Sequence, residues 1–171
     1  MSADRYRLYS ETDLASVIDD MARQAVVLLD ATPTVVLGER LLARMRVHAP
    51  WADIARLDLM VKRYADNLEL LHPDTALEAP DDCQLAGRRV IVVDDVLYQG
   101  YSLARVFEWL ATQKPAQVHA AVLVDRQRHR LPMRADIVGV TLKIAPGDVI
   151  ECNVPPYEAE FAVDLWRPGA V

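Results

Sequence analysis

The sequence predicts an α/β protein with a mostly parallel, twisted sheet and helices on both of its faces. Apolar, strand-like runs alternate along the chain with segments of helical periodicity. One run, Val90 to Val93, consists of four consecutive β-branched residues, the pattern of a strand buried on both faces of a parallel sheet. A chain of 171 residues with 52% apolar composition can bury one hydrophobic core, so we expect a single domain over residues 1–171.

The N-terminal half begins with a predicted helix, followed by a strand and a second helix. Ser10 with Asp13 is typical of an N-cap with an acidic first turn. The apolar face of this first helix comprises Leu14, Val17, Ile18, Met21, Ala22, Ala25 and Leu28. Thr34 to Leu37 predicts a first strand that stops at Gly38, and Glu39 to Val47 predicts the next helix.

The rest of the chain predicts further strands, one helix and a long loop. Ile54 to Val61 is compatible with a second strand, whereas Lys62 to Pro80 is mixed in charge and non-periodic, which favours a surface loop. The later elements are strands at Val90 to Val93, Val118 to Val124 and Ile137 to Val140, a helix at Leu103 to Leu110, and an extended segment from Thr141 onward.

Composition excludes several classes of function. A net charge of −6 and a pI near 5.2 argue against broad non-specific binding to nucleic acid or anionic membranes. Cys83 and Cys152 belong to no paired-cysteine motif, so we expect two reduced thiols in a cytoplasmic protein. No apolar run approaches the ~20 residues that span a bilayer, and no secretory signal is present, so we expect no membrane partner. Walker and G-x-G-x-x-G motifs are also missing.

The most informative segment is V-I-V-V-D-D-V-L-Y-Q-G-Y-S, Val90 to Ser102. We expect its strand to stop at Asp94 and Asp95, at the carboxyl end, where open α/β sheets place their ligands. Successive strand residues point to opposite faces, so one carboxylate is expected to meet a bound hydroxyl or metal water and the other the loop backbone. Amides of the loop around Gly100 and of the following helix can hold a phosphate without a lysine.

This segment resembles the ribose-5-phosphate-binding signature of the type I phosphoribosyltransferases, which use phosphoribosyl pyrophosphate. The likeness is greatest to members that regulate pyrimidine metabolism and have uracil phosphoribosyltransferase activity, in which the acidic pair precedes V-L-Y-T-G-R-T. A second block, Ala121 to Arg126 with Leu131 to Gly139, is similar to the family's A-V-L-V-D-R and L-P-I-R-A-D-F-V-G. By itself an acidic pair after an apolar strand also occurs in phosphoacceptor receiver domains and in solvated turns. The resemblance implies the family's fold with a small hood.

The resemblance also implies the activity and its residues. A pyrimidine base, with uracil giving UMP as the expected case, would displace pyrophosphate from phosphoribosyl pyrophosphate. Asp94 and Asp95 would hold the ribose hydroxyls, directly or through the waters of a Mg²⁺ ion. The 5′-phosphate would lie in the loop formed by Val96, Leu97, Tyr98, Gln99, Gly100, Tyr101 and Ser102. Tyr98 replaces a carboxylate of the 6-oxopurine enzymes, which favours a pyrimidine; a tyrosine packed under the loop is the equal alternative.

The pyrophosphate side departs from the family pattern. Gly38 leads almost directly into a helix, where the family has a loop similar to G-I-R-T-R-G that clamps pyrophosphate. Arg40 is a partial substitute or simply an exposed helical arginine. Lys62 and the candidate catalytic residue Arg63 stand in a segment similar to the family's L-D-x-x-L-Y-R-D-D hood loop and could close over pyrophosphate; solvated surface charges are the alternative.

Within the phosphate loop, Gln99 stands where the family has a threonine, and Tyr101 where an arginine is frequent. These departures leave two hypotheses. The first is an active enzyme. The second is a catalytically silent, nucleotide-binding relative that regulates pyrimidine metabolism or gene expression.

The resemblance implies a homodimer, and the corresponding region of the pyrimidine regulators lies near a surface that meets messenger RNA. The densest basic cluster comprises Arg126, Arg128, His129, Arg130 and Arg134. The acidic balance and the lack of interleaved aromatic residues favour a solvated or dimer-facing loop over an RNA surface.

Overall fold

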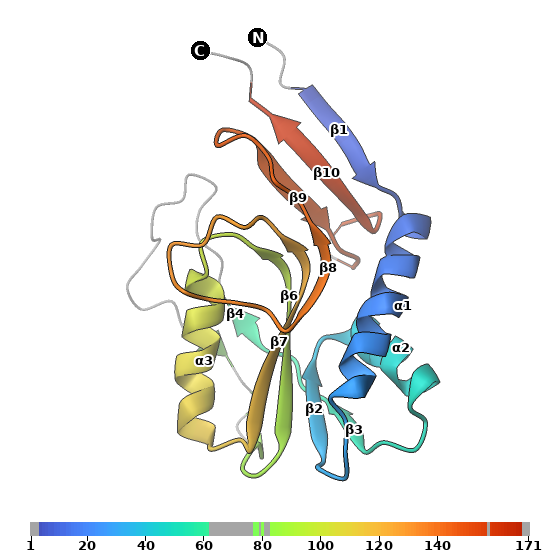
Figure 1. Ribbon diagram of the computed structural model, residues 1–171, viewed down its shortest axis with the longest axis vertical. Helices are drawn as coiled ribbons and strands as arrows, with labels where there is room; N and C mark the ends of the chain where they lie inside the picture. Colours follow the sequence, from blue (N-terminus) through green and yellow to red (C-terminus); the bar gives the residue numbers. More distant parts are fainter. Residues whose placement is uncertain (1–3, 62–76, 79, 81–82, 157, 169–171) are drawn as a thin grey trace.

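A computed structural model describes residues 4–61, 77–78, 80, 83–156 and 158–168 of the chain. Five parallel strands form its main sheet, in the order β3-β2-β6-β7-β8 (Figure 1). Their bounds are β2 Thr34–Leu37, β3 Ile54–Arg56, β6 Arg89–Leu97, β7 Gln117–Asp125 and β8 Ile137–Thr141. The predicted α/β fold with a parallel sheet is confirmed.

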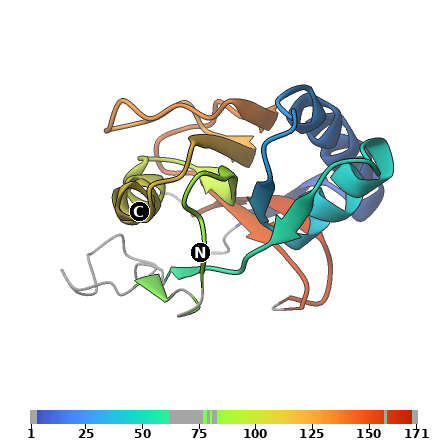
Figure 2. The same cartoon turned by 90° about the horizontal axis from the view of Figure 1, so that it is seen from below.

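Helices cover both faces of this sheet, as predicted. Helices α1 (Glu11–Val27) and α2 (Glu39–His48) pack on one face, and α3 (Tyr101–Gln113) packs on the other (Figure 2). Strand β6 is apolar on both of its faces because each face is covered by helices. Ile91 belongs to the core beneath α1 and α2, and its neighbour Val90 belongs to the core beneath α3.

Helix α1 begins where the sequence predicts. Ser10 Oγ accepts the Asp13 N–H at 3.4 Å, and the Ser10 N–H donates to Asp13 Oδ2 at 2.9 Å, which together make a capping box. The buried residues of α1 are Leu14, Ile18, Met21, Ala22 and Ala25. The predicted apolar face therefore packs on the sheet, with Val17 and Leu28 at its margin.

A second, antiparallel sheet lies beyond the carboxyl ends of the parallel strands, in the order β1-β10-β9 (Figure 1). We call this sheet the hood; it comprises β1 Asp4–Tyr9, β9 Val149–Asn153 and β10 Ala162–Arg167. Asp164, only 2% exposed, accepts from Arg5 and Arg7 across the β1–β10 pair. The sequence pattern predicted an extended C-terminal segment but no strand at β1, whose partner residues in β10 stand 154 to 163 positions away in the chain.

Two strand predictions need correction. Ile54 to Val61 is not one strand: β3 ends at Arg56, after which Met60–Val61 forms β4 and pairs with β5, Leu77–Glu78. Strand β6 does not stop before Asp94, because its ladder with β7 continues to the pair Leu97 and Asp125. Most of the predicted surface loop, residues 62–76, lies outside the described residues. No helix in the described part of the chain is long and apolar enough to cross a membrane.

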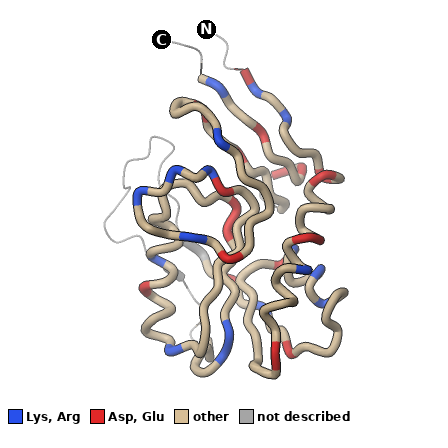
Figure 3. Tube along the Cα trace, in the orientation of Figure 1, with Lys and Arg blue, Asp and Glu red and all other residues tan. Residues whose placement is uncertain are grey.

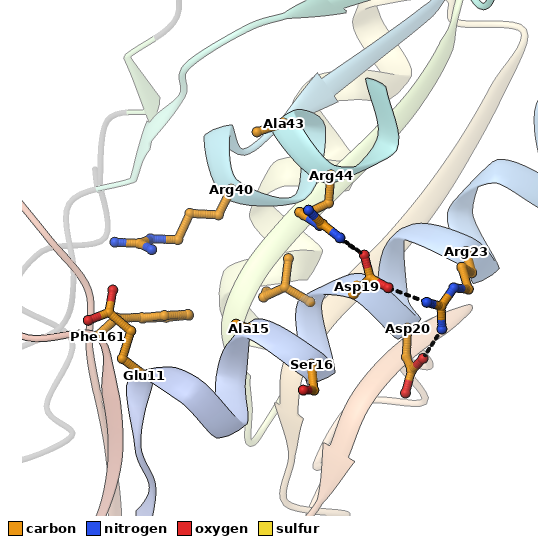
Figure 4. A pocket seen from close by; sticks show the side chains of 11 residues that line it. Glu11, Ala15, Ser16, Asp19, Asp20, Arg23, Arg40, Ala43, Arg44 and Phe161 are labelled. Carbon is orange, nitrogen blue, oxygen red and sulfur yellow. Dashed lines mark hydrogen bonds and ion pairs between the residues drawn. The ribbon is translucent and has the colours of Figure 1, made fainter. Parts of the chain in front are cut away.

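An ionic cluster around Asp19 joins α1 to α2. Asp19 accepts from Arg44 Nε at 2.9 Å and lies 2.8 Å from His48 Nε2, and Arg23 also contacts it (Figure 4). The hydrogen bond from Arg44, followed by that from His48, lowers the pKa of the Asp19 carboxyl to about 2.

This lowered pKa predicts an acid-dependent loss of stability. An unfolded aspartate has a pKa of about 3.9, so the cluster stabilises the fold fully above about pH 4 and loses its contribution as the pH falls toward about 2. Asp19→Asn is expected to lower the thermal midpoint at pH 7 by a margin that shrinks toward pH 2. Asp20→Asn, which removes an exposed pair with Arg23, is the control. Thermal unfolding at several pH values measures both; a constant margin for Asp19→Asn contradicts the linkage.

Candidate functional site

A cavity of about 600 Å³ lies at the carboxyl end of β6. Asp94 lines it together with the consecutive residues Val96 to Arg105, and Glu108 and Arg130 complete the lining. The structure therefore brings one carboxylate of the acidic pair together with the whole predicted phosphate loop. The cavity extends along the first two turns of α3, where the chain turns away from the sheet.

The two carboxylates of the acidic pair are oriented by the strand backbone. Asp94 Oδ1 accepts the Asp95 N–H at 2.9 Å, and Asp95 Oδ1 accepts the Val96 N–H at 2.8 Å. Both residues are half-buried, but only Asp94 lines the cavity. Successive strand residues point to opposite faces, which accounts for this difference. Which carboxylate meets a bound hydroxyl or metal water stays a prediction.

Backbone N–H groups gather at the turn that follows. Within the described chain, the N–H groups from Gln99 to Leu103 have no acceptor, and Ala104 makes the first helical bond, to Gly100 O at 3.0 Å. Gly100 caps α3 without a side-chain hydrogen bond. The helix start therefore presents donors and the positive end of its dipole, which together suit an anion. The Val96 N–H is already used, so this cradle begins after the strand.

The loop after β7 holds the phosphate loop in place. Gln99 O accepts the N–H groups of Arg130 and Leu131 at 3.1 and 3.2 Å. Gly100 has a φ of 93°, and a Cβ there would lie 2.8 Å from Met133 Cγ. The second sequence block is thus the packing support of the first, which explains physically why the two occur together.

Comparison with known proteins agrees with this geometry. The phosphoribosyl transferase domain family matches residues 12–160. The chain belongs to the type I phosphoribosyltransferase family. It is 35% identical over 137 residues to the bifunctional protein PyrR of Deinococcus deserti, covering 79% of this chain and 74% of that one. It is 28% identical over 173 residues to the PyrR protein of Thermosynechococcus vestitus, covering 99% and 94%.

Solved structures of other phosphoribosyltransferases share the fold. A hypoxanthine-guanine phosphoribosyltransferase of Bacillus anthracis superposes with a TM-score of 0.72 at 18% identity, covering 96% of this chain and 99% of that one. A hypoxanthine phosphoribosyltransferase of Trypanosoma cruzi superposes with a TM-score of 0.73 at 18% identity, covering 97% and 96%. The resemblance inferred from the loop motif is confirmed at the level of family and fold.

The connection between β2 and α2, where the sequence analysis placed the pyrophosphate-side residues, is short. Gly38 alone separates β2 from α2, and a Cβ on it would lie 2.8 Å from Val93 Cβ, so the end of β2 packs tightly against the middle of β6. Arg40 does not line the phosphate-loop cavity. Its guanidinium lies 4.3 Å from the centre of the Phe161 ring, in a second cavity of about 650 Å³ between α1, α2 and the hood (Figure 4). Lys62 and Arg63 lie outside the described residues.

Five residues of the cavity lining were not predicted as site residues by the sequence analysis: Leu103, Ala104, Arg105, Glu108 and Arg130. Arg105 and Glu108 follow Tyr101 at helical spacing, which was the sequence signal that could have placed them on the same helix face. Arg105 Nη1 lies 3.8 Å from Glu108 Oε2. Arg130 was noted only as part of the basic cluster, because its contact with Gln99 joins two loops that are distant in the sequence.

The basic cluster does not form one surface. Figure 3 shows its basic positions along the segment after β7, beside the acidic strand end. Arg126 is buried, and His129 Nε2 lies 2.9 Å from Asp125 Oδ1, whereas Arg128, Arg130 and Arg134 are exposed.

The donor set of the acidic pair fits magnesium. Asp94 and Asp95 offer carboxylate oxygens, and Mg²⁺ is usually held by one or two carboxylates together with waters and substrate phosphates. Among the described residues, no group of three or more His, Cys, Asp or Glu could hold a metal by itself.

Gly100→Ala is expected to destabilise the protein by about 2–3 kcal/mol, because a left-handed backbone costs an alanine about 1 kcal/mol and overpacking against Met133 costs about 1–2 more. Gly147→Ala is the matched control, since a Cβ there meets nothing within 4 Å, and it is expected to change stability by less than about 0.5 kcal/mol. Urea unfolding measures both. Equal losses for the two variants would show that Gly100 is not required by this packing.

Proposed function

We propose that the protein transfers the phosphoribosyl group of phosphoribosyl pyrophosphate to a pyrimidine base, with uracil giving UMP as the expected reaction. The observation that carries the proposal is the cradle of backbone N–H groups from Gln99 to Leu103, which shares one cavity with Asp94. Membership of the phosphoribosyltransferases and similarity to proteins named PyrR support the same assignment.

The cavity suggests how the substrate is held. The 5′-phosphate accepts from the amides between Gln99 and Leu103 and from the Ser102 hydroxyl. The ribose hydroxyls donate to Asp94, and the Asp94 and Asp95 carboxylates would hold a magnesium ion. The chemistry that a magnesium ion supplies here is neutralisation of the pyrophosphate charge. Tyr98 lines the cavity while Arg126 covers its ring, so packing under the loop and contact with the base are compatible roles.

The reaction needs positioning more than proton transfer. The C1–oxygen bond of the substrate breaks, and its electron pair leaves with pyrophosphate. N1 of the base bonds to C1, and the N1 proton passes to solvent water. Positive charge develops on the ribose ring, so the Asp94 and Asp95 carboxylates stabilise the transition state electrostatically. Only Gly38 stands between β2 and α2, so we propose that Lys62 or Arg63 closes over the leaving pyrophosphate.

The role of the carboxylates is tested by measuring the release of pyrophosphate in a mixture of protein, magnesium, phosphoribosyl pyrophosphate and uracil. Asp94→Asn is expected to lower kcat/KM by about 10²–10³-fold, the scale of losing one electrostatic group in an active site. Asp53→Asn, an exposed aspartate at the amino end of β3, is the control and is expected to retain activity. Wild-type rates in Asp94→Asn contradict the assignment, and no release with any base rejects the enzyme.

A second function is favoured by the single residue between β2 and α2. Without a loop there, the protein is a candidate nucleotide-binding regulator of pyrimidine metabolism or gene expression that does not turn over. Calorimetry separates the two functions: a regulator binds phosphoribosyl pyrophosphate or UMP but releases no pyrophosphate. Lack of binding by every phosphorylated ribose ligand rejects both.

Arg130 provides a test of the phosphate end of the cavity. Its side chain makes no hydrogen bond or ion pair with another described residue, and it supplies a cation to a loop that carries Tyr101 where relatives often have arginine. Arg130→Gln is expected to weaken ribose 5-phosphate binding by about 10-fold or more at low salt, since one charge-assisted contact contributes about 1.5–3 kcal/mol. Arg128→Gln is the control, because this exposed arginine does not line the cavity. Equal affinities in calorimetry remove Arg130 from the site.

A further inference from the structure

Arg126 connects two parts of the molecule that the proposed reaction uses separately. It directly follows β7 and is only 5% exposed. Its N–H donates to Leu97 O at 3.0 Å, and its guanidinium carbon lies 4.1 Å from the centre of the Tyr98 ring. The buried Arg126 side chain therefore holds Tyr98, the first residue of the phosphate loop after β6.

The other edge of the same guanidinium reaches the start of β9. Arg126 Nη2 donates to Asp148 O at 2.9 Å. Asp148 is 6% exposed, and its carboxylate accepts from Arg167 Nε at 3.2 Å and Nη2 at 3.0 Å. Arg167 is the last residue of β10, so direct contacts run from the hood through Asp148 and Arg126 to Tyr98.

Stability alone does not explain a buried arginine in this place. Arg126 Nε is the one buried side-chain nitrogen or oxygen in the described chain that lacks a hydrogen-bond partner. Burial also lowers the pKa of the Arg126 guanidinium. The Asp148 carboxylate, which could have paired with Arg126, instead accepts hydrogen bonds from Arg167. An incompletely paired buried charge is costly, and an apolar side chain of similar size would be cheaper. Its geometry, a flat group in contact with a loop and with the hood, offers a different reason for its presence.

We propose that Arg126 is a positioning residue that couples the phosphate loop to the hood. Ligand in the loop fixes Tyr98, Tyr98 fixes the guanidinium, and the guanidinium fixes the Asp148 end of β9 and, through Arg167, β10. The inference rests on the proposed function, because it makes occupation of the sugar-phosphate cavity the event that orders the hood above it. An ordered hood excludes water from the reacting centre.

Hydrogen exchange with ribose 5-phosphate as the probe tests the coupling. In the wild-type protein with saturating ligand, amide exchange is expected to slow at residues 98–103 and, by about fivefold or more, at 149–153. Arg126→Lys keeps the positive charge but lacks the planar guanidinium that stacks on the Tyr98 ring and reaches Asp148 O. This variant is expected to retain the ligand-induced protection from exchange at 98–103 and to lose it at 149–153. Arg128→Lys, on an exposed neighbour, is expected to behave as wild type.

A second variant keeps the coupling testable if Arg126→Lys does not fold. Arg167→Met acts at a side chain that is 54% exposed, and it is expected to lose the protection of the hood while leaving loop protection intact. Unchanged ligand protection at 149–153 in both variants overturns the coupling. Slowed exchange at 98–103 with no change at 149–153 in the wild type overturns it as well.

A ligand-free arm separates this inference from the proposed function. If ribose 5-phosphate protects nothing in the wild type, binding and the proposed function fail together, but the link can still be measured. Tyr98→Leu is expected to speed exchange at 149–153 by about fivefold in the wild-type background and to add little in Arg126→Lys. Equal effects of Tyr98→Leu in the two backgrounds overturn the coupling whatever the ligand does.

Discussion

The pairing of β6 with β7 is the constraint on which the rest of the structure depends. The ladder runs in register from Arg89 and Gln117 to Leu97 and Asp125. Because the strands are parallel, both turn away from the sheet at the same edge. The phosphate loop and the segment that follows β7 therefore meet there, and Gln99 O accepts hydrogen bonds from the N–H groups of Arg130 and Leu131. The candidate site is a consequence of two strands that end side by side.

Buried arginines at the two ends of this ladder have different surroundings. Arg89, at the amino end, is 2% exposed; its Nε donates to Gln117 Oε1 and its other nitrogens to Asp30, whose pKa it holds well below the ordinary value. Arg126, at the carboxyl end, meets a ring and a carbonyl and leaves Nε without a partner. A fully paired charge serves the fold, whereas incomplete pairing is concentrated where ligands bind in open α/β sheets.

Prediction from sequence succeeded where the signal is local or periodic. The Ser10 capping box, the apolar face of α1 and the β-branched core of β6 depend on neighbours within a few residues, and each was visible. Strand β1 and the split between β3 and β4 were missed, because pairing with distant strands decides them. Arg130 was seen as a charge but not as part of the cavity, because its place depends on a contact between loops.

The sequence by itself determined the fold class, the family and the position of the acidic pair with its loop, because these follow from hydrophobic pattern and from contiguous motifs. Only the tertiary structure decided that Asp94 rather than Asp95 lines the cavity, that Arg40 turns to Phe161, and that Arg126 joins Tyr98 to the hood. The physical reason is that a side chain's direction is set by packing against elements remote in the chain, which no local pattern encodes.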